Sequence, residues 1–228
     1  ENVTSRIFQG LKTSADKIYI VEEQERQVDK VRVFSAETNS EHWLEADLLH
    51  PLLKGGDSRR YSQFRTNRVI LFPYAAASDD SFVRLIPEDV LKSTYPLTWQ
   101  YLADNKVYLE NRESGKMRGL QWYAYGRSQA LDVMSLPKIF TPDLANKAAY
   151  SLDETGEAFF TGGVAGGYGI LVKREYSREY ILGLLNSRLL EWVIRQTATQ
   201  MRGGYFSFEA RFIRGLPIRT IDFTDPAD

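Results

Sequence analysis

The sequence has 228 residues, 43% of them apolar, and its 29 Lys and Arg against 30 Asp and Glu give a formal net charge of -1. This size supports one substantial hydrophobic core, and we expect one domain with a helical annex. The absence of cysteine excludes disulfides, thiolate metal sites and a cysteine nucleophile. No run of about 18 apolar residues and no signal-peptide pattern occur, so we expect a soluble, cytoplasmic protein without a membrane partner.

The first third of the chain predicts strands around one short helix. β-branched and aromatic residues predict strands at 17–21 and 30–34, which we expect to pair as a hairpin, and a third strand at 68–72. Leucines at helical spacing predict a helix over 43–53, which the following glycines end. Because the chain begins with glutamate instead of methionine, we also expect it to be a segment of a longer polypeptide.

The rest of the chain predicts two helices, then strands, then a helix. Pro87 followed by two acidic residues is a helix start, and apolar spacing predicts a second helix over 96–112. The runs KIFTP, AAYSL, AFFTG and YGILV, all within 138–172, predict an antiparallel meander or part of a barrel. Residues 177–200 predict one long helix that Ser177 caps, ended by the glycines at 203 and 204. These elements predict an α+β fold with a mixed, mostly antiparallel sheet, short helices and one long C-terminal helix.

Two histidines, His42 and His50, lie in the predicted helix over 43–53 or directly before it. A zinc site built on them would need carboxylates such as Glu45 or Asp47, but their spacing is not a ligand motif. We interpret both as ordinary histidines on a helix surface or cap, and we predict no metal site.

Charge is distributed unevenly along the chain. Residues 22–47 hold eight acids against three basic residues, a net charge of -5, whereas residues 54–74 hold five basic residues against one acid. Two further basic segments, 112–127 and 197–219, each hold four basic residues against one acid, and both are rich in aromatic residues. Arginine beside aromatic residues is typical of surfaces that contact phosphates and bases, although such residues are also common on solvated faces and in cores.

The sequence lacks a recognisable catalytic centre. The glycines of TGGVAGGYG at 161–169 precede a predicted strand instead of a helix, so we interpret the segment as a hairpin connection and not as a cofactor loop. An adenine methyltransferase would need an Asn- or Asp-Pro-Pro-aromatic motif, and a magnesium nuclease a Pro-Asp followed by Glu-x-Lys; neither occurs. We therefore predict a domain that is not an enzyme, with no catalytic and no cofactor-binding residues.

The order of several segments resembles a known family. FQGLKTSADKIYIV, LLKGGDSRRY, RVILFPY, YPLTWQYLADNKVYLENR, LPKIFTPDL and LGLLNSRLLEWVIRQTATQMRGGYFSFEARFIRGLPI occur in order over nearly the whole chain. Together they resemble the TaqI-like C-terminal specificity domain of adenine-N6 DNA methyltransferases and of fused type II restriction-modification enzymes. The resemblance implies that residues 1–228 form an α/β DNA target-recognition domain of a larger bacterial or archaeal protein. Its partners would be double-stranded DNA and a covalently linked N-terminal methyltransferase domain that binds AdoMet.

The basic segments supply the candidate DNA contacts. These are Lys54, Arg59, Arg60, Tyr123, Arg127, Arg202, Arg211 and Arg214. The aromatic and aliphatic residues of the tail, from Tyr205 to Leu216, are expected to pack it onto the domain. One alternative is a protein-interaction module that uses the acidic segment 22–47, and another is a small-ligand enzyme with 161–169 as its loop.

Overall fold

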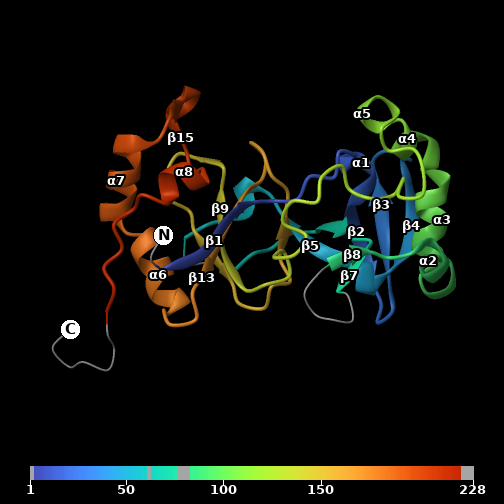
Figure 1. Ribbon diagram of the computed structural model, residues 1–228, viewed down its shortest axis with the longest axis horizontal. Coiled ribbons are helices and arrows are strands. Elements are labelled where there is room, and N and C mark those ends of the chain that lie inside the picture. The colour runs from blue at the N-terminus through green and yellow to red at the C-terminus, as the bar shows by residue number, and fades with distance from the viewer. Residues whose placement is uncertain (1–2, 61–62, 77–82, 222–228) are drawn as a thin grey trace.

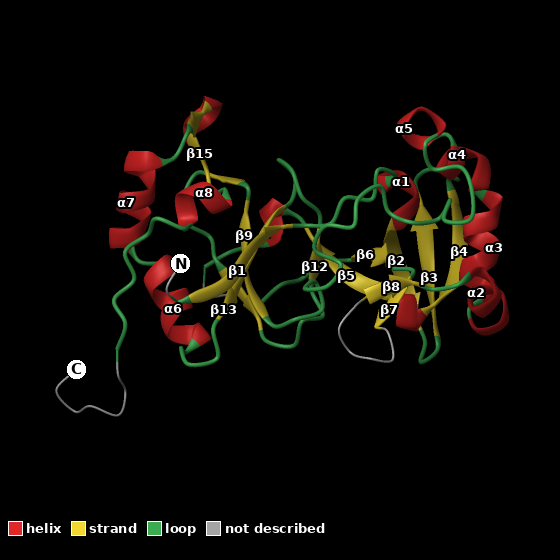
Figure 2. Cartoon of the chain, in the orientation of Figure 1, coloured by secondary structure: helices red, strands yellow, loops and turns green. Residues whose placement is uncertain are grey.

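The computed structural model describes residues 3–60, 63–76 and 83–221. Its helices and strands form two groups along the long axis of the molecule (Figures 1 and 2). The mixture of helices with mostly antiparallel sheets confirms the predicted α+β class. In this part of the chain, no helix is both long and apolar enough to cross a membrane.

One group is built on a six-stranded sheet. The strands, in spatial order, are β12 (Phe159–Phe160), β5 (Leu49–Leu53), β6 (Arg68–Leu71), β2 (Ile20–Arg26), β3 (Lys30–Ser35) and β4 (Ser40–Glu45). Neighbours are antiparallel except for β12 and β5. Helix α3 packs against β4, at the edge of the sheet (Figure 1). The other elements of this group are α1 (Asp16–Tyr19), η1 (Ala46–Leu48), η2 (Gly55–Asp57), the pair β7 (Tyr74–Ala76) and β8 (Val83–Leu85), α2 (Glu88–Thr94), α3 (Pro96–Asp104), α4 (Lys106–Glu110) and α5 (Arg112–Gly115).

A second, four-stranded antiparallel sheet joins the two groups. Its order is β1 (Thr4–Gln9), β13 (Gly167–Val172), β9 (Lys138–Pro142) and β11 (Ser151–Asp153). Successive residues of a strand point to opposite faces, and here each face meets a different core. Phe8 and Phe140 belong to the core shared with the six-stranded sheet, whereas Ile7 and Ile139 belong to a second core. One sheet therefore serves both hydrophobic cores.

The C-terminal third covers the outer face of the four-stranded sheet. It contains α6 (Arg178–Leu185), α7 (Arg188–Thr197), η3 (Arg202–Gly204) and α8 (Ala210–Ile213). A small sheet joins β10 (Leu144–Ala145), β15 (Tyr205–Ser207) and β14 (Gln200–Met201) in that order. In Figure 1, the β14–β15 hairpin projects beyond the body of this group.

The predicted helix over 43–53 is wrong. Its residues form the end of β4, the single turn η1 and strand β5. Leu49 and Leu53 lie on one face of β5 and Leu52 on the other, and all three are buried, so this leucine-rich strand can have the same pattern as a helix. His42 and His50 accordingly lie on strands, with the His50 ring stacked on Phe159 at 4.0 Å between centroids.

The predicted long helix over 177–200 is two helices. Ser177 caps the first through a bond from the Tyr180 amide, as expected, but α6 ends at Leu185. Ser187 then caps α7 through the Leu190 amide. Between them, Asn186 is fully buried and uses its side chain on another segment, which explains the break.

Two smaller predictions need correction. Residues 17–21 form helix α1 followed by the start of β2, although β2 and β3 do pair as the expected hairpin. The glycine-rich segment is not a hairpin connection, because β12 belongs to the six-stranded sheet and β13 to the four-stranded one. The segment instead carries the chain from one sheet to the other.

Candidate nucleic-acid interface

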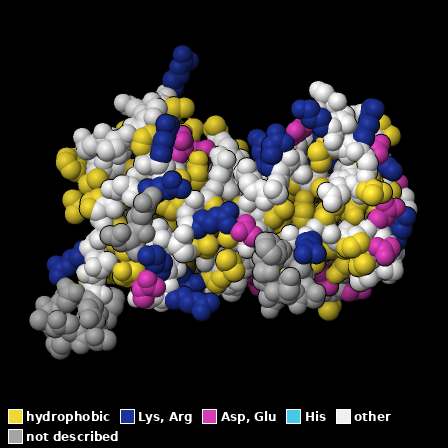
Figure 3. Space-filling view, viewed as in Figure 1, with side chains coloured by type: hydrophobic (Ala, Val, Ile, Leu, Met, Phe, Trp, Pro, Cys, Tyr) yellow, Lys and Arg dark blue, Asp and Glu magenta, His cyan; other side chains and the backbone are white. Residues whose placement is uncertain are grey.

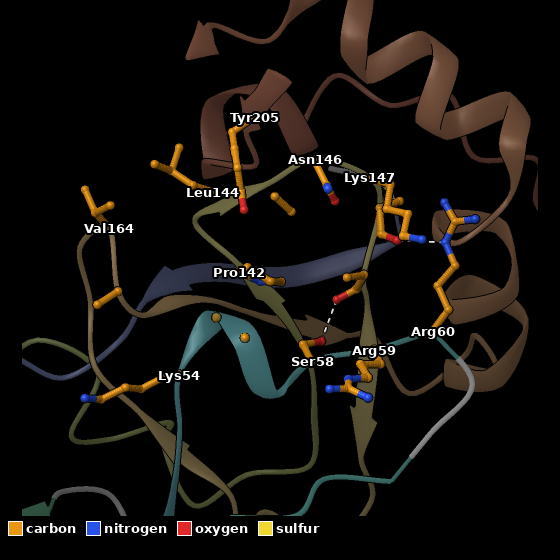
Figure 4. A pocket seen from close by; sticks show the side chains of 16 residues that line it. Lys54, Ser58, Arg59, Arg60, Pro142, Leu144, Asn146, Lys147, Val164 and Tyr205 are labelled. Carbon is orange, nitrogen blue, oxygen red and sulfur yellow. Dashed lines mark hydrogen bonds between the residues drawn. The ribbon is translucent and has the colours of Figure 1, made fainter. Parts of the chain in front are cut away.

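A cleft of about 790 Å³ opens where segments far apart in the sequence meet (Figure 4). Its walls are the η2 turn, the segment 142–149 between β9 and β11, residues 164–165 of the glycine-rich segment, and Tyr205 of β15. Three of the segments that carry the family resemblance, LLKGGDSRRY, LPKIFTPDL and the tail that contains Tyr205, contribute to these walls. The fold thus assembles one concave surface from separate parts of the chain.

Cations dominate the polar lining of this cleft. Lys54, Arg59, Arg60 and Lys147 contribute charged groups, and Asn146 contributes a carboxamide. Among the described residues, no acidic side chain lines it. Three of the predicted contact residues, Lys54, Arg59 and Arg60, therefore lie together in one concave surface of basic composition.

The η2 turn is fixed by two polar side chains. Asp57 accepts a bond from the backbone amide of Lys54 at 2.7 Å and pairs with Arg68, so its charge is neutralised locally. Ser58 is buried and donates its hydroxyl hydrogen to the carbonyl of Ala149 at 2.5 Å. The turn is thereby tied to the opposite wall of the cleft, while Lys54 and Arg59 stay exposed.

The guanidinium of Arg60 is held by two polar groups of the protein. Its Nε donates to the Ala148 carbonyl at 2.7 Å, and its Nη2 pairs with Glu191 of α7. Glu191 also pairs with Arg195 at 2.6 Å. This guanidinium is held at the wall of the cleft between two elements, so its charge is already compensated.

The Arg-Gly-Gly-Tyr segment forms the turn of the β14–β15 hairpin. Gly203 and Gly204 both have φ near +77°, a conformation that favours glycine and is typical of tight hairpin turns. Arg202 is exposed at this turn, and Tyr205, 44% exposed, lines the cleft. Figure 3 shows a basic side chain at the outer end of the projection.

The remainder of the tail packs as expected. Phe208, Ile213 and Leu216 are buried in the second core, although Tyr205 is not. Arg211 pairs with Glu209 at 3.0 Å and lies over the Phe212 ring. Apart from Tyr205, none of these residues lines the cleft.

Arg214 lies in a different concavity. It lines a hollow of about 530 Å³ at β1 with Arg6 and Lys173, residues that do not line the cleft. Arg6 is paired with Asp132 at 2.5 Å. The structure therefore separates Arg214 from the other predicted contacts of the tail.

Two predicted contacts belong to the other group of elements. Tyr123 is only 2% exposed, and its hydroxyl donates to the Ile86 carbonyl at 2.7 Å, so it has no exposed face to offer to DNA. Arg127 is exposed but pairs with Glu113 at 2.8 Å. Hydrogen bonds from Arg127 and Ser14 lower the pKa of the Glu113 carboxyl and keep this pair ionised.

The acidic segment 22–47 carries less free charge than its composition indicates. Most of its carboxylates have partners within the domain: Glu23 with Arg26, Glu25 and Glu41 with Arg32, Glu37 with Lys17, and Glu45 with backbone amides at the start of α3. In the described chain, no group of three metal-ligating side chains is placed to hold an ion.

Sequence reasoning missed three polar residues of the cleft: Asn146, Lys147 and Ser58. The first two lie in a short loop with no turn or binding motif, so nothing in the sequence distinguished them. Ser58 could have been noticed only as a polar residue inside a basic segment.

One known family model matches most of the chain. Residues 50–218 match the model of the TaqI-like C-terminal specificity domain. The chain belongs to this family. This confirms the resemblance drawn from the sequence, and the matched range includes every wall of the cleft.

Two bacterial relatives have the same module within longer chains. The type II restriction enzyme and methyltransferase RM.Eco57I of Escherichia coli is 30% identical over 97% of this chain, which spans 23% of that protein. The type II methyltransferase M.BstVI of Geobacillus stearothermophilus is 24% identical over 91% of this chain, which spans 32% of that protein. The specificity domain thus corresponds to about a quarter to a third of each relative.

Proposed function

We propose that this chain is a sequence-specific DNA recognition module that positions a separate methyltransferase or endonuclease domain on its target site. The observation that carries the proposal is the cleft, which gathers four cations, one carboxamide and one aromatic ring without an acidic lining residue. A specificity domain needs such a surface, since phosphate contacts supply most of the affinity and polar contacts to base edges supply the selectivity.

The predicted contacts divide into different roles under this proposal. Lys54, Arg59 and Arg202 are exposed in the cleft or beside it and would contact phosphates. Arg60 would position the wall of the cleft, because its hydrogen-bonding groups are engaged with Ala148 and Glu191.

The remaining predicted contacts do not line the cleft. Arg211 and Arg214 stay predictions as phosphate contacts outside the cleft. We omit Tyr123 because it is buried, and Arg127 because it lies in the other group of elements and is paired with Glu113.

Catalysis belongs to another part of the protein in this proposal. Domains of the relatives outside the matched region would bind AdoMet and transfer the methyl group, and the fused relative also carries the name of a restriction enzyme. This chain would contribute the choice of site, working beside the covalently linked N-terminal methyltransferase domain.

The test is fluorescence anisotropy of a labelled duplex of mixed sequence, titrated with the chain at low and rising salt. Lys54→Glu should weaken binding strongly, because it places an acid in the cleft. The matched control is Lys92→Glu on α2, where Lys92 pairs with Glu88 outside the cleft. Equal losses for the two variants, or no binding by the unmodified chain, would contradict the proposal.

A further inference from the structure

Side chains of distant segments hold several backbone carbonyls of the loop between β10 and β11. Three of its carbonyl oxygens accept hydrogen bonds from side chains of distant segments: Asn146 from Arg195 at 2.5 Å, Ala148 from Arg60 at 2.7 Å, and Ala149 from Ser58 at 2.5 Å. The donors come from α7 and from the residues that follow η2. The loop is therefore fixed from two sides.

The end of the loop is clamped as well. The buried side chain of Asn186, between α6 and α7, accepts from the Tyr150 amide at 3.0 Å and donates to the Tyr150 carbonyl at 2.8 Å. Glu191 in turn joins two of the donors, because it pairs with both Arg60 and Arg195. Side chains from three segments thus fix this backbone within one connected network.

Two polar side chains of this fixed loop, those of Asn146 and Lys147, face the cleft. Asn146 and Lys147 are exposed and line the cleft, and Figure 4 shows Asn146 near Tyr205 and Lys147 toward Arg60. In the described part of the chain, neither side chain has a hydrogen-bond or ion-pair partner. The backbone of this loop is therefore fixed, and the polar groups of both side chains are available to a ligand in the cleft.

We infer that Asn146 is a specificity-determining residue that reads an adenine in the major groove of the bound DNA. The inference rests on the proposed function and deepens it. A carboxamide has a donor and an acceptor side by side, which match N7 and the N6 amino group of adenine. Lys147, the next residue, would contact a neighbouring guanine edge or phosphate.

The other polar residues of the cleft are less suited to this role. Lys54 and Arg59 are cations on long side chains, which suit phosphates that are equivalent at every step of the duplex. Recognition of adenine by two hydrogen bonds requires a donor and an acceptor side by side, which a lysine or arginine side chain lacks. Asn146 combines both groups with a short side chain on a clamped backbone.

The experiment is selection from a random duplex pool at low salt, followed by sequencing, for the unmodified chain, Asn146→Asp, Asn146→Ala and a control. Aspartate has acceptors only, so it should move the preference at one position from adenine toward cytosine, whose N4 amino group donates. Alanine should relax the same position, with a loss of discrimination of roughly five- to a hundredfold.

The control is Asn111→Asp, which makes the same chemical change on the exposed residue between α4 and α5, outside the cleft. It should leave the selected sequence unchanged. The melting temperatures of the two Asn146 variants should match that of the unmodified chain, because no described residue makes a hydrogen bond with the Asn146 side chain.

The outcomes separate this inference from the function on which it rests. A selected sequence that is the same for the unmodified chain and both Asn146 variants overturns the inference and leaves the proposed function standing. Retention of DNA without any enriched sequence contradicts the sequence-specific part of the proposed function and, with it, the inference, since the chain then contacts phosphates alone. No retention of DNA contradicts the proposed function itself.

Discussion

Replacement of Arg60 by methionine distinguishes a positioning residue from a phosphate contact. Methionine keeps an apolar stem but loses the 2.7 Å bond to the Ala148 carbonyl and the ion pair with Glu191. Ala148 is 1% exposed, so its carbonyl is left without a partner, which costs about 1–3 kcal/mol. Glu191 keeps Arg195 as its partner, which limits the additional loss.

We expect Arg60→Met to reduce the free energy of unfolding by about 2–3 kcal/mol. For a chain of this size, that corresponds to a fall in Tm of about 4–12 °C. The slope of log affinity for DNA against log salt should stay unchanged, because the residue neutralises no phosphate. Lys54→Met should behave in the opposite way, with a slope smaller by about one and a change in stability within ~0.5 kcal/mol.

The assay is thermal unfolding of each variant together with a salt titration of duplex binding by anisotropy. Arg60→Lys adds a second comparison, because it keeps the charge and loses the guanidinium fork that reaches two acceptors at once. It should therefore retain most of the destabilisation. A slope reduced by one with an unchanged Tm in Arg60→Met would falsify the positioning role and restore Arg60 as a phosphate contact.

Three further predictions concern the fold. Arg112 is buried and donates to four backbone carbonyls. Arg112→Met should therefore destabilise the chain by about 3 kcal/mol or more in urea unfolding. The control Arg118→Met, at an exposed site, should change stability by less than ~0.5 kcal/mol. Burial lowers the pKa of His50 to about 4 from an ordinary value near 6.5. A contribution of roughly 3 kcal/mol to the free energy of unfolding is therefore present above pH 6.5 and is lost as the pH falls toward 4. His50→Gln should abolish that part of the pH dependence of unfolding. Glu45 accepts from two amides at the first turn of α3, and Glu45→Gln should cost about 1 kcal/mol, so an unchanged urea midpoint would contradict this capping role.

Local patterns were sufficient for much of the fold. Strand β3, predicted over 30–34 from its β-branched and aromatic residues, spans Lys30–Ser35 and alternates between buried and less buried residues. Pro87 and Ser177 mark the starts of α2 and α6, where the sequence placed them. Such features succeed because the information lies within a few consecutive residues.

Tertiary contacts decide the features that sequence reasoning missed. The sequence of strand β5 resembles that of a helix because both of its faces carry buried leucine, which depends on what the fold packs against each face. The helix predicted over 177–200 breaks at Asn186, whose side chain bonds to Tyr150, a residue distant in the sequence. Neither partner is visible from the local pattern.

The charge pattern located the candidate site only in part, because it counts basic residues without regard to their partners. Arg112 belongs to a basic segment, but its guanidinium is buried among carbonyls. Lys138 is fully buried and pairs with Asp153 at 2.6 Å. Lys54 and Arg59, in contrast, are exposed in the cleft. The composition of a segment cannot distinguish exposed basic residues from buried ones.

The clamp on the loop of Asn146 acts through backbone carbonyls, which every residue possesses. Arg195, Arg60 and Ser58 would therefore hold the same loop whatever side chains stood at positions 146 and 147. Within the described residues, the two side chains that face the cleft have no hydrogen-bond or ion-pair partner, so their replacement should cost little stability. If Asn146 reads a base, this architecture lets the recognised sequence change by substitution at two positions while the core, the clamp and the cations of the cleft stay as they are.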